Sequence, residues 1–350
     1  METRKVQRTG KSTFIVSLPK NWATKNSIEV GSLIYISPTG NGELLLSVDR
    51  TEQDLTAKLD IGDKSGEPLI RDIIACYVAG YRKIEVRSRF MSSGQKKDIR
   101  QIVNKLIGPE ILEETINKVL IQDLLSPEEL QIKQALKRIK NVVRSLIEDS
   151  ISSLVNSDRD LALDVIQRDN DVDRLNLLVL RQFMEMLRSG SPNQGKMDSI
   201  TGFTYMQAAS NLERIADHAL SIAETASKCE STPKGETLKI LERLKPIMVE
   251  LIDDSVSCLL QTDSEKANDI IERARDVRRG LEETANLTNL GNCKEVLVSL
   301  VVAGSIERIL DYIMNLGELA INLRMASMQS ETFEHKSNHP AIVERTHQEA

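Results

Sequence analysis

The chain has 350 residues, of which 40% are hydrophobic, 28% charged and only 3% aromatic. These values exclude a disordered or fibrous chain, and a core with few rings favours packed helices. The net charge of −6 excludes a uniformly basic nucleic-acid-binding protein. However, residues 1–30 carry six basic and two acidic residues, a balance of +4 that leaves −10 for the remainder. We therefore expect a mainly helical, acidic body preceded by a small basic module.

Residues 1–48 have the pattern of a small β domain. Apolar runs of strand length occupy 14–18, 33–36 and 44–48, and Thr-Gly-Asn-Gly at 39–42 is a hairpin signal. Strands this few and this short bury little surface alone, so a second copy of the chain is expected to pair with them. The candidate DNA-binding residues are the basic ones, Arg4, Lys5, Arg8, Lys11, Lys20 and Lys25.

Residues 49–125 form a connecting segment with a mixed pattern. The predicted elements are a helix over 69–78, a strand over 83–87, a helix over 96–106, and strands over 111–116 and 119–124 after a Gly-Pro break. This pattern predicts a small α/β segment, to which the sequence assigns no chemistry.

Residues 126–328 carry helical periodicity almost without interruption. A helix start is expected at Ser126-Pro127-Glu128-Glu129, because serine caps, proline is tolerated in the first turn and acids favour the positive dipole end. Breaks at 156–158, 189–192, 231–235, 262–263 and 289–292 leave six helices, each of about 25 to 35 residues. Residues 329–350 are a polar tail that we expect to be disordered.

An internal repeat organises these helices. Residues 147–152 (IEDSIS) resemble 252–257 (IDDSVS) at an offset of 105, and 212–217 (LERIAD) resemble 306–311 (IERILD) at an offset of 94. Two tandem three-helix bundles explain both offsets. The sequence therefore predicts a mainly α protein with one bundle over 126–230 and a second over 236–328.

Two carboxylate pairs occupy equivalent positions of this repeat. Glu213 and Asp217 are four residues apart on a predicted helix, as are Glu307 and Asp311, so each pair projects from one helix face. A single pair of this kind is also typical of a solvated acidic surface, but its recurrence in both repeats favours a site. Because every ligand is an oxygen atom, we expect a hard divalent cation or an iron-type ion, whose identity the sequence leaves open.

The helix that faces these pairs differs between the repeats. In the first repeat it carries Asp169 and Asp173, which are expected to join the site, whereas the equivalents in the second are Ala274 and Arg278. A guanidinium group neutralises a carboxylate without any metal. We therefore expect the second bundle to bind metal weakly or to contain an ion pair instead.

No motif supports catalysis. Gly10-Lys11-Ser12-Thr13 imitates the end of a phosphate-binding loop, but Lys5 stands where the first glycine belongs and a strand follows. The four cysteines lie far apart, which indicates a reducing cytoplasm, and no apolar run approaches the length of a membrane span. We expect a cytoplasmic, non-enzymatic protein without direct membrane insertion. A carboxylate-bridged metalloenzyme is the alternative that the acidic pairs leave open, beside the two regulatory functions described below.

Two stretches resemble known families. RKVQRTGKSTFIVSLPKNWA and IEVGSLIYI, within residues 4–48, resemble the AbrB/MazE-like (SpoVT-AbrB) swapped-hairpin domain, in which two chains interlace and a basic face binds DNA. NLERIADHALSIAE (211–224) and, less closely, SIERILDYIMNLGE (305–318) resemble the ExxxD motifs of PhoU, the phosphate uptake regulator, whose two three-helix bundles can hold metal clusters. Together they resemble archaeal PhoU-type regulators with an AbrB-like N-terminal domain.

The resemblance implies a regulator of phosphate homeostasis that binds DNA through its first domain and metal through its ExxxD helices. Its partners are then DNA, a second copy in a homodimer or higher oligomer, and a phosphate transporter or sensor kinase. In the alternative reading, the protein acts only by contact with such a transporter or kinase, and its first domain serves to dimerise.

Overall fold

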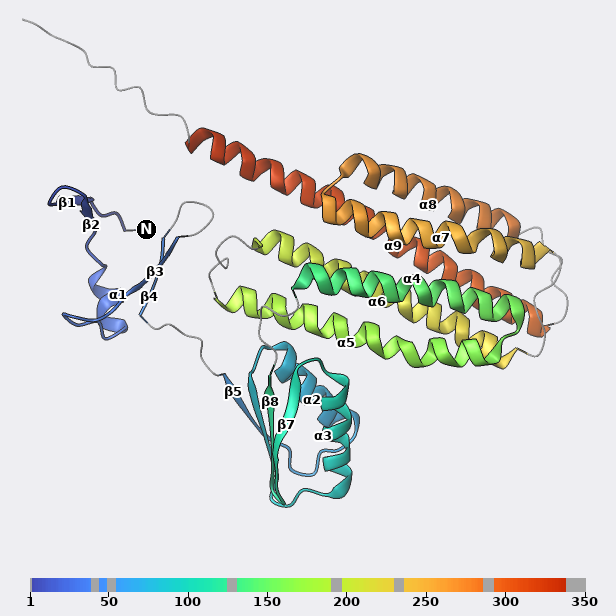
Figure 1. Ribbon diagram of the computed structural model, residues 1–350, viewed down its shortest axis with the longest axis horizontal. Helices are drawn as coiled ribbons and strands as arrows, with labels where there is room; N and C mark the ends of the chain where they lie inside the picture. Colours follow the sequence, from blue (N-terminus) through green and yellow to red (C-terminus); the bar gives the residue numbers. More distant parts are fainter. Residues whose placement is uncertain are drawn as a thin grey trace, which may run out of the picture.

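The computed structural model describes residues 2–38, 44–48, 55–124, 131–189, 197–229, 236–285 and 293–337. The fold is mainly α, as the sequence predicts. Along the chain it consists of two small β hairpins, an α/β layer and a long helical body (Figure 1). Within the described residues, no helix is long and apolar enough to cross a membrane.

The N-terminal part consists of two hairpins and a short helix between them. Strands β1 (Gln7–Thr9) and β2 (Thr13–Ile15) pair antiparallel around a turn that contains Gly10, whose φ of 66° suits glycine. Helix α1 (Lys20–Lys25) lies between the two hairpins in sequence. Strands β3 (Tyr35–Pro38) and β4 (Leu44–Ser47) also pair antiparallel, on either side of the predicted turn at 39–42, which lies outside the described residues.

The connecting segment is an α/β layer. Its elements are β5 (Thr56–Asp60), α2 (Glu67–Val78), β6 (Lys83–Arg87), α3 (Ser93–Lys105), β7 (Pro109–Glu114) and β8 (Lys118–Asp123). The sheet has the order β5-β6-β8-β7, with β5 parallel to β6 and the other neighbours antiparallel. Both helices cover one face of this sheet (Figure 1), where Leu69, Ile73, Tyr77 and Ile99 are fully buried.

Two details of this layer differ from the prediction. Strand β5 was not expected, because TAKLD alternates only two apolar residues with polar ones. Helix α3 begins three residues earlier than expected, since Ser92 caps it: the Ser92 hydroxyl accepts from the Gln95 N–H, and the Gln95 side chain accepts from the Ser92 N–H.

The helical body contains the six predicted helices. They are α4 (Ile132–Asn156), α5 (Arg159–Ser189), α6 (Ser199–Lys228), α7 (Glu236–Gln261), α8 (Ser264–Ala285) and α9 (Cys293–Ser337). The breaks after α4 and α7 are confirmed. Ser157 and Thr262, which are equivalent in the repeat, both adopt a left-handed backbone there, with φ of 49° and 57°. The predicted helix start at Ser126 lies outside the described residues.

The ends of the last two helices correct the prediction. Helix α8 has 22 residues, fewer than expected, and α9 has 45, so the chain stays helical to Ser337 instead of becoming a disordered tail after 328. Residues 329–337 (QSETFEHKS) contain no glycine or proline to stop a helix, and Gln, Glu and Lys are good helix formers.

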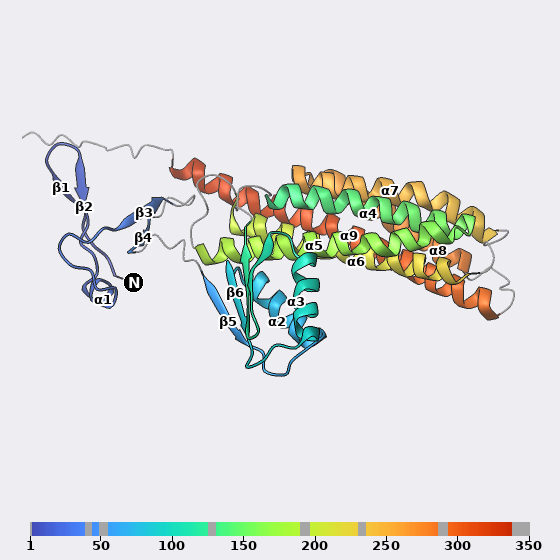
Figure 2. The same ribbon diagram turned by 60° about the horizontal axis from the view of Figure 1, so that its bottom comes forward.

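The repeat is visible in the contacts between helices. The two bundles pack through equivalent helices, α4 against α7 and α6 against α9, around one continuous apolar core (Figure 2). In the first bundle Arg168 pairs with Asp149 at 2.5 Å; the equivalent Arg273 and Asp254 pair at 3.4 Å in the second. The spacing of the helices is therefore set in the same way in both copies.

Candidate metal centre and nucleic-acid surface

The N-terminal hairpins expose nearly all of their side chains. The six basic residues lie on this surface, and α1 contains no buried residue. Arg4 forms an ion pair with Glu2 at 2.7 Å, and Arg8 donates a hydrogen bond to the Lys11 carbonyl across the β1–β2 turn. The other basic side chains therefore extend from a surface whose only described acids are Glu2 and Glu29.

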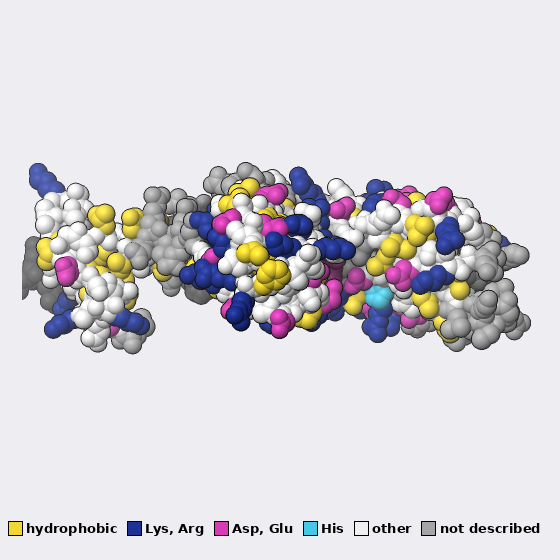
Figure 3. All heavy atoms as spheres, turned by 90° about the horizontal axis from the view of Figure 1, so that it is seen from below, with side chains coloured by type: hydrophobic (Ala, Val, Ile, Leu, Met, Phe, Trp, Pro, Cys, Tyr) yellow, Lys and Arg dark blue, Asp and Glu magenta, His cyan; other side chains and the backbone are white. Residues whose placement is uncertain are grey.

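Large apolar side chains are exposed on the same hairpins. Phe14 is 71% exposed, Leu33 76% and Leu44 65%. Figure 3 shows apolar and basic side chains together on this end of the molecule. Such a concentration of apolar surface is typical of an interface and not of an isolated domain.

The first bundle brings two of its predicted site residues together. Asp173 lies on α5 and Asp217 on the adjacent α6. Burial and the negative charge of Asp217 raise the pKa of Asp173, while Lys105 at the end of α3 acts in the opposite direction. The α/β layer therefore contributes a positive charge beside this site.

Asp217 is the second carboxylate of this site. Burial raises its pKa, against the opposing effects of His218 and Arg214. His218 stacks on Tyr312 of α9, with ring centroids 6.0 Å apart and an interplanar angle of 27°. Glu213, one turn before Asp217, is half-buried.

Asp173 and Asp217 repel each other at this place. Burial is the largest cause of both raised pKa values, and the charge of Asp217 adds to it at Asp173, so a cation bound there would offset part of the repulsion. Asp169 lies one turn before Asp173 on α5, but its side chain is outside the description. Among the side chains that are described, no group of three or more Asp, Glu, His or Cys residues lies close enough to hold a metal ion.

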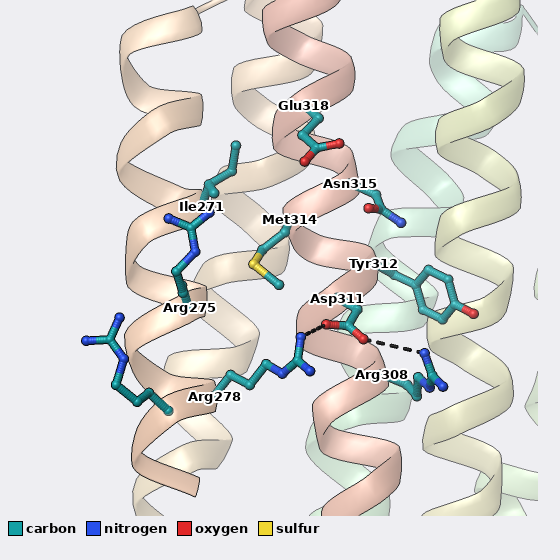
Figure 4. Close-up of a pocket in the computed structure, with 10 residues that line it drawn as sticks. Ile271, Arg275, Arg278, Arg308, Asp311, Tyr312, Met314, Asn315 and Glu318 are labelled. Carbon is teal, nitrogen blue, oxygen red and sulfur yellow. Dashed lines mark hydrogen bonds and ion pairs between the residues drawn. The ribbon is translucent and has the colours of Figure 1, made fainter. Parts of the chain in front are cut away.

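The equivalent place in the second bundle contains an ion pair. Arg278 of α8 reaches Asp311 of α9 at 2.6 Å, and Arg308 approaches the same carboxylate at 3.6 Å (Figure 4). Glu307 is half-buried on α9. The ion pair that the sequence predicted is therefore present, and a guanidinium group occupies the place of a cation.

Sequence reasoning missed a pocket beside this ion pair. It has a volume of about 640 Å³ and lies between α8 and α9, where four arginines line it: Arg275, Arg278, Arg279 and Arg308. The run Arg273-Ala-Arg-Asp-Val-Arg-Arg279 on one helix was the signal that could have revealed it.

Fold and sites together define a class of protein: two repeated three-helix bundles with ExxxD helices, preceded by a basic β module. The model of the PhoU domain matches residues 136–226 and 241–320, which are the two bundles. The model described as "Antidote-toxin recognition MazE, bacterial antitoxin" matches residues 7–54. The chain is thus a PhoU-domain protein with an N-terminal domain of the MazE/AbrB type.

Several known proteins are similar to this chain. The chain is 28% identical over 143 residues to the "Phosphate-specific transport system accessory protein PhoU homolog" of Aquifex aeolicus, covering 41% of this chain and 64% of that protein. It is 25% identical over 211 residues to homolog 1 of Thermotoga maritima, covering 57% and 88%. The crystal structure of PhoU from Pseudomonas aeruginosa superposes with a TM-score of 0.48 at 18% identity, covering 56% and 96%.

Proposed function

We propose that this protein is a cytoplasmic, non-enzymatic regulator of phosphate uptake that binds DNA through its N-terminal domain and metal through its first bundle. The matches to the PhoU domain over both bundles carry the first part of this proposal. The relatives' names, which describe accessory proteins of a phosphate-specific transport system, support a role in phosphate uptake.

The N-terminal surface supports the DNA-binding part. Basic and large apolar side chains are exposed together on an N-terminal part that buries almost nothing. If two copies join through the apolar side chains, their basic residues combine into one surface of twelve. Such a surface neutralises about six to eight phosphates, so the logarithm of the DNA affinity should fall against the logarithm of salt concentration with a slope of about −5 to −7.

Fluorescence anisotropy with duplex DNA at several salt concentrations tests this part. The double variant Arg8→Ala with Lys11→Ala should weaken binding and reduce the slope by about two units or more, because both chains of a dimer lose charge. The control is Lys133→Ala with Lys137→Ala, which removes two exposed charges from α4. DNA affinity that does not change with salt concentration, or that Arg8→Ala with Lys11→Ala leaves unchanged, favours the alternative. In that alternative the protein contacts only a phosphate transporter or sensor kinase.

Light scattering of a chain that lacks residues 1–48 tests the pairing of two copies. Because the hairpins leave Phe14, Leu33 and Leu44 exposed, their removal should lower the oligomeric state. If the shortened chain keeps the mass of the full-length assembly, the N-terminal domain is not the interface.

Elemental analysis tests the metal site. Glu213→Ala with Asp217→Ala should remove most of the bound metal, since it removes two of the four carboxylates that the sequence predicts for this site. Glu307→Ala with Asp311→Ala should remove little, because Arg278 already neutralises Asp311. Equal losses from both pairs would contradict the asymmetry, and unmutated protein that stays metal-free after loading would contradict the site.

A further inference from the structure

The arginine pocket, lined by Arg275, Arg278, Arg279 and Arg308, occupies the face of the second bundle between α8 and α9. Its volume of about 640 Å³ falls within the range of small-molecule sites, roughly 300 to 1,000 Å³. Apart from the four guanidinium groups, its charged lining is Asp311 and Glu318. The lining therefore carries more positive than negative charge.

Within the described part of the chain, two of the arginines are held by exposed pairs on their own helix. Arg275 pairs with Glu272 one turn earlier, and Arg279 approaches Asp276 at 3.6 Å. The side chains of both arginines are half-exposed or more, at 50% and 63%. Exposed pairs of this kind contribute little stability, so a more highly charged ligand can draw both guanidinium groups toward itself.

One carboxylate links the other two arginines at one side of the pocket. Asp311 accepts a hydrogen bond from Arg278 at 2.6 Å and lies 3.6 Å from Arg308, whose side chain is 65% exposed (Figure 4). The same view shows Arg275 on α8 above Arg278, with Met314 of α9 facing them. The pocket thus combines one guanidinium group held by a close ion pair, that of Arg278, with three in more exposed pairs.

We propose that this pocket binds a small phosphate-bearing anion, in the place where the first bundle presents carboxylates for a metal. The planar fork of a guanidinium group matches two phosphoryl oxygens at once, and several forks around one cavity favour a ligand with several such oxygens. The volume accommodates more than one phosphoryl group. The inference rests on the second bundle alone and is independent of DNA binding and of the metal site.

Isothermal titration calorimetry of the full chain, in buffer with a chelator, tests the proposal. The probes are inorganic phosphate, tripolyphosphate and, as a tricarboxylate of comparable charge, citrate. At least one phosphate probe should bind clearly more tightly than citrate. Binding of tripolyphosphate alone identifies a ligand with several phosphoryl groups, whereas comparable binding of inorganic phosphate identifies the free ion. Citrate that binds as tightly as both, or no binding of either phosphate probe, would overturn the proposal.

The double variant Arg275→Gln with Arg279→Gln locates the site. Because these side chains are half-exposed or more, the fold should persist, and phosphate affinity should drop about ten-fold or more as two charge-assisted contacts are lost. The matched control is Arg138→Gln with Arg159→Gln, which removes the same charge from exposed positions of the first bundle and should leave affinity unchanged. Equal losses in the two double variants would mean that net charge, and not the pocket, attracts the anion.

A third variant separates this site from the metal site. Glu213→Ala with Asp217→Ala should keep the phosphate affinity, because these residues line the other bundle. If it abolishes binding while the arginine variant does not, the anion is held through a metal in the first bundle and the inference is wrong.

Discussion

The position of Asp173 in the first repeat and Arg278 in the second reverses a charge between the two sites of the helical body. Asp173 in the first repeat increases the negative charge around Asp217, while its equivalent Arg278 pairs with Asp311 at 2.6 Å. The helices around both positions are equivalent, so the difference in chemistry comes from these side chains and not from the fold.

Replacement of this arginine by aspartate tests the role of that position. Arg278→Asp should increase the metal content of loaded protein, up to about one additional ion per chain, because it restores a carboxylate beside Asp311. Elemental analysis after gel filtration measures the change. The control Arg278→Gln removes the guanidinium without adding a ligand and should increase metal content less; equal contents in both variants would mean that loss of the cation alone matters.

Asp198 at the start of α6 gives a prediction for pH. Although burial opposes it, hydrogen bonds from Thr201 and from the N–H groups of Ile200 and Thr201 lower the pKa of Asp198. Asp198→Ala should therefore lower the free energy of unfolding by about 1 kcal/mol near neutral pH. Because the folded-state pKa is below the unfolded value, this contribution is fully present above about pH 4 to 5 and is lost as pH falls through the folded pKa.

Urea unfolding at several pH values measures this effect. Asp198→Asn keeps a capping oxygen without the charge, so its difference from the unmutated chain should shrink as pH falls below about 4. A difference that stays constant with pH would show that the carboxylate charge contributes nothing to the cap.

At the scale of elements, the third helices of the two bundles differ in one close contact. Gly317 of α9 replaces Ala223 of α6, and a Cβ atom at position 317 would lie 2.8 Å from Ile271 Cγ1 and 3.2 Å from the Ala267 carbonyl. A Cβ atom added at Gly304 of the same helix would have no other atom within 4 Å. Gly317 therefore permits close packing of α9 on α8, whereas Gly304 only weakens the helix.

This contrast predicts opposite effects of one substitution. Gly304→Ala should stabilise the protein by up to about 1 kcal/mol through helix propensity. Gly317→Ala should destabilise it by about 1 to 2 kcal/mol, because overpacking against Ile271 exceeds that gain. Thermal unfolding of both variants measures the difference, and equal stabilisation by both would show that α8 and α9 separate easily.

The elements were largely predictable because the repeat and the turn residues are local signals. The strands β6 and β8, the helix α2 and the helix breaks after α4 and α7 agree with the sequence pattern within a residue or two. Strand β5 was missed because only Ala57 and Leu59 mark it, and it forms through pairing with β6. The ion pair of Arg278 followed from the repeat, whereas the arginine pocket depends on how far α8 lies from α9.

At the scale of the whole molecule, a buried arginine connects the α/β layer to the helical body. Arg181 of α5 is 2% exposed and forms ion pairs with Asp123 of β8 at 2.8 Å and with Glu185 at 3.0 Å. It also donates to the carbonyls of Tyr77 and Tyr81 at 2.6 and 3.1 Å. This one side chain therefore joins a strand, a helix end and a turn of the layer to the first bundle.

The connection predicts local undocking when Arg181 is changed. Arg181→Met keeps most of the apolar stem but removes the cation beside two carboxylates, which should cost about 3 kcal/mol or more. Because the layer has its own apolar core, the loss should appear first as faster hydrogen exchange in β8 and at the end of α2, and only later as global unfolding.

A second substitution distinguishes this electrostatic connection from simple packing. Adding Asp123→Asn to Arg181→Met removes one of the two carboxylates left beside the lost cation, so part of the hydrogen-exchange protection should return. Asp123→Asn alone should cost less than Arg181→Met, because Glu185 still balances the arginine. If the loss of hydrogen-exchange protection in the double variant equals the sum of the losses in the two single variants, the layer docks through shape alone. Because Lys105 of this layer lies near Asp173, undocking should also alter metal affinity in the first bundle.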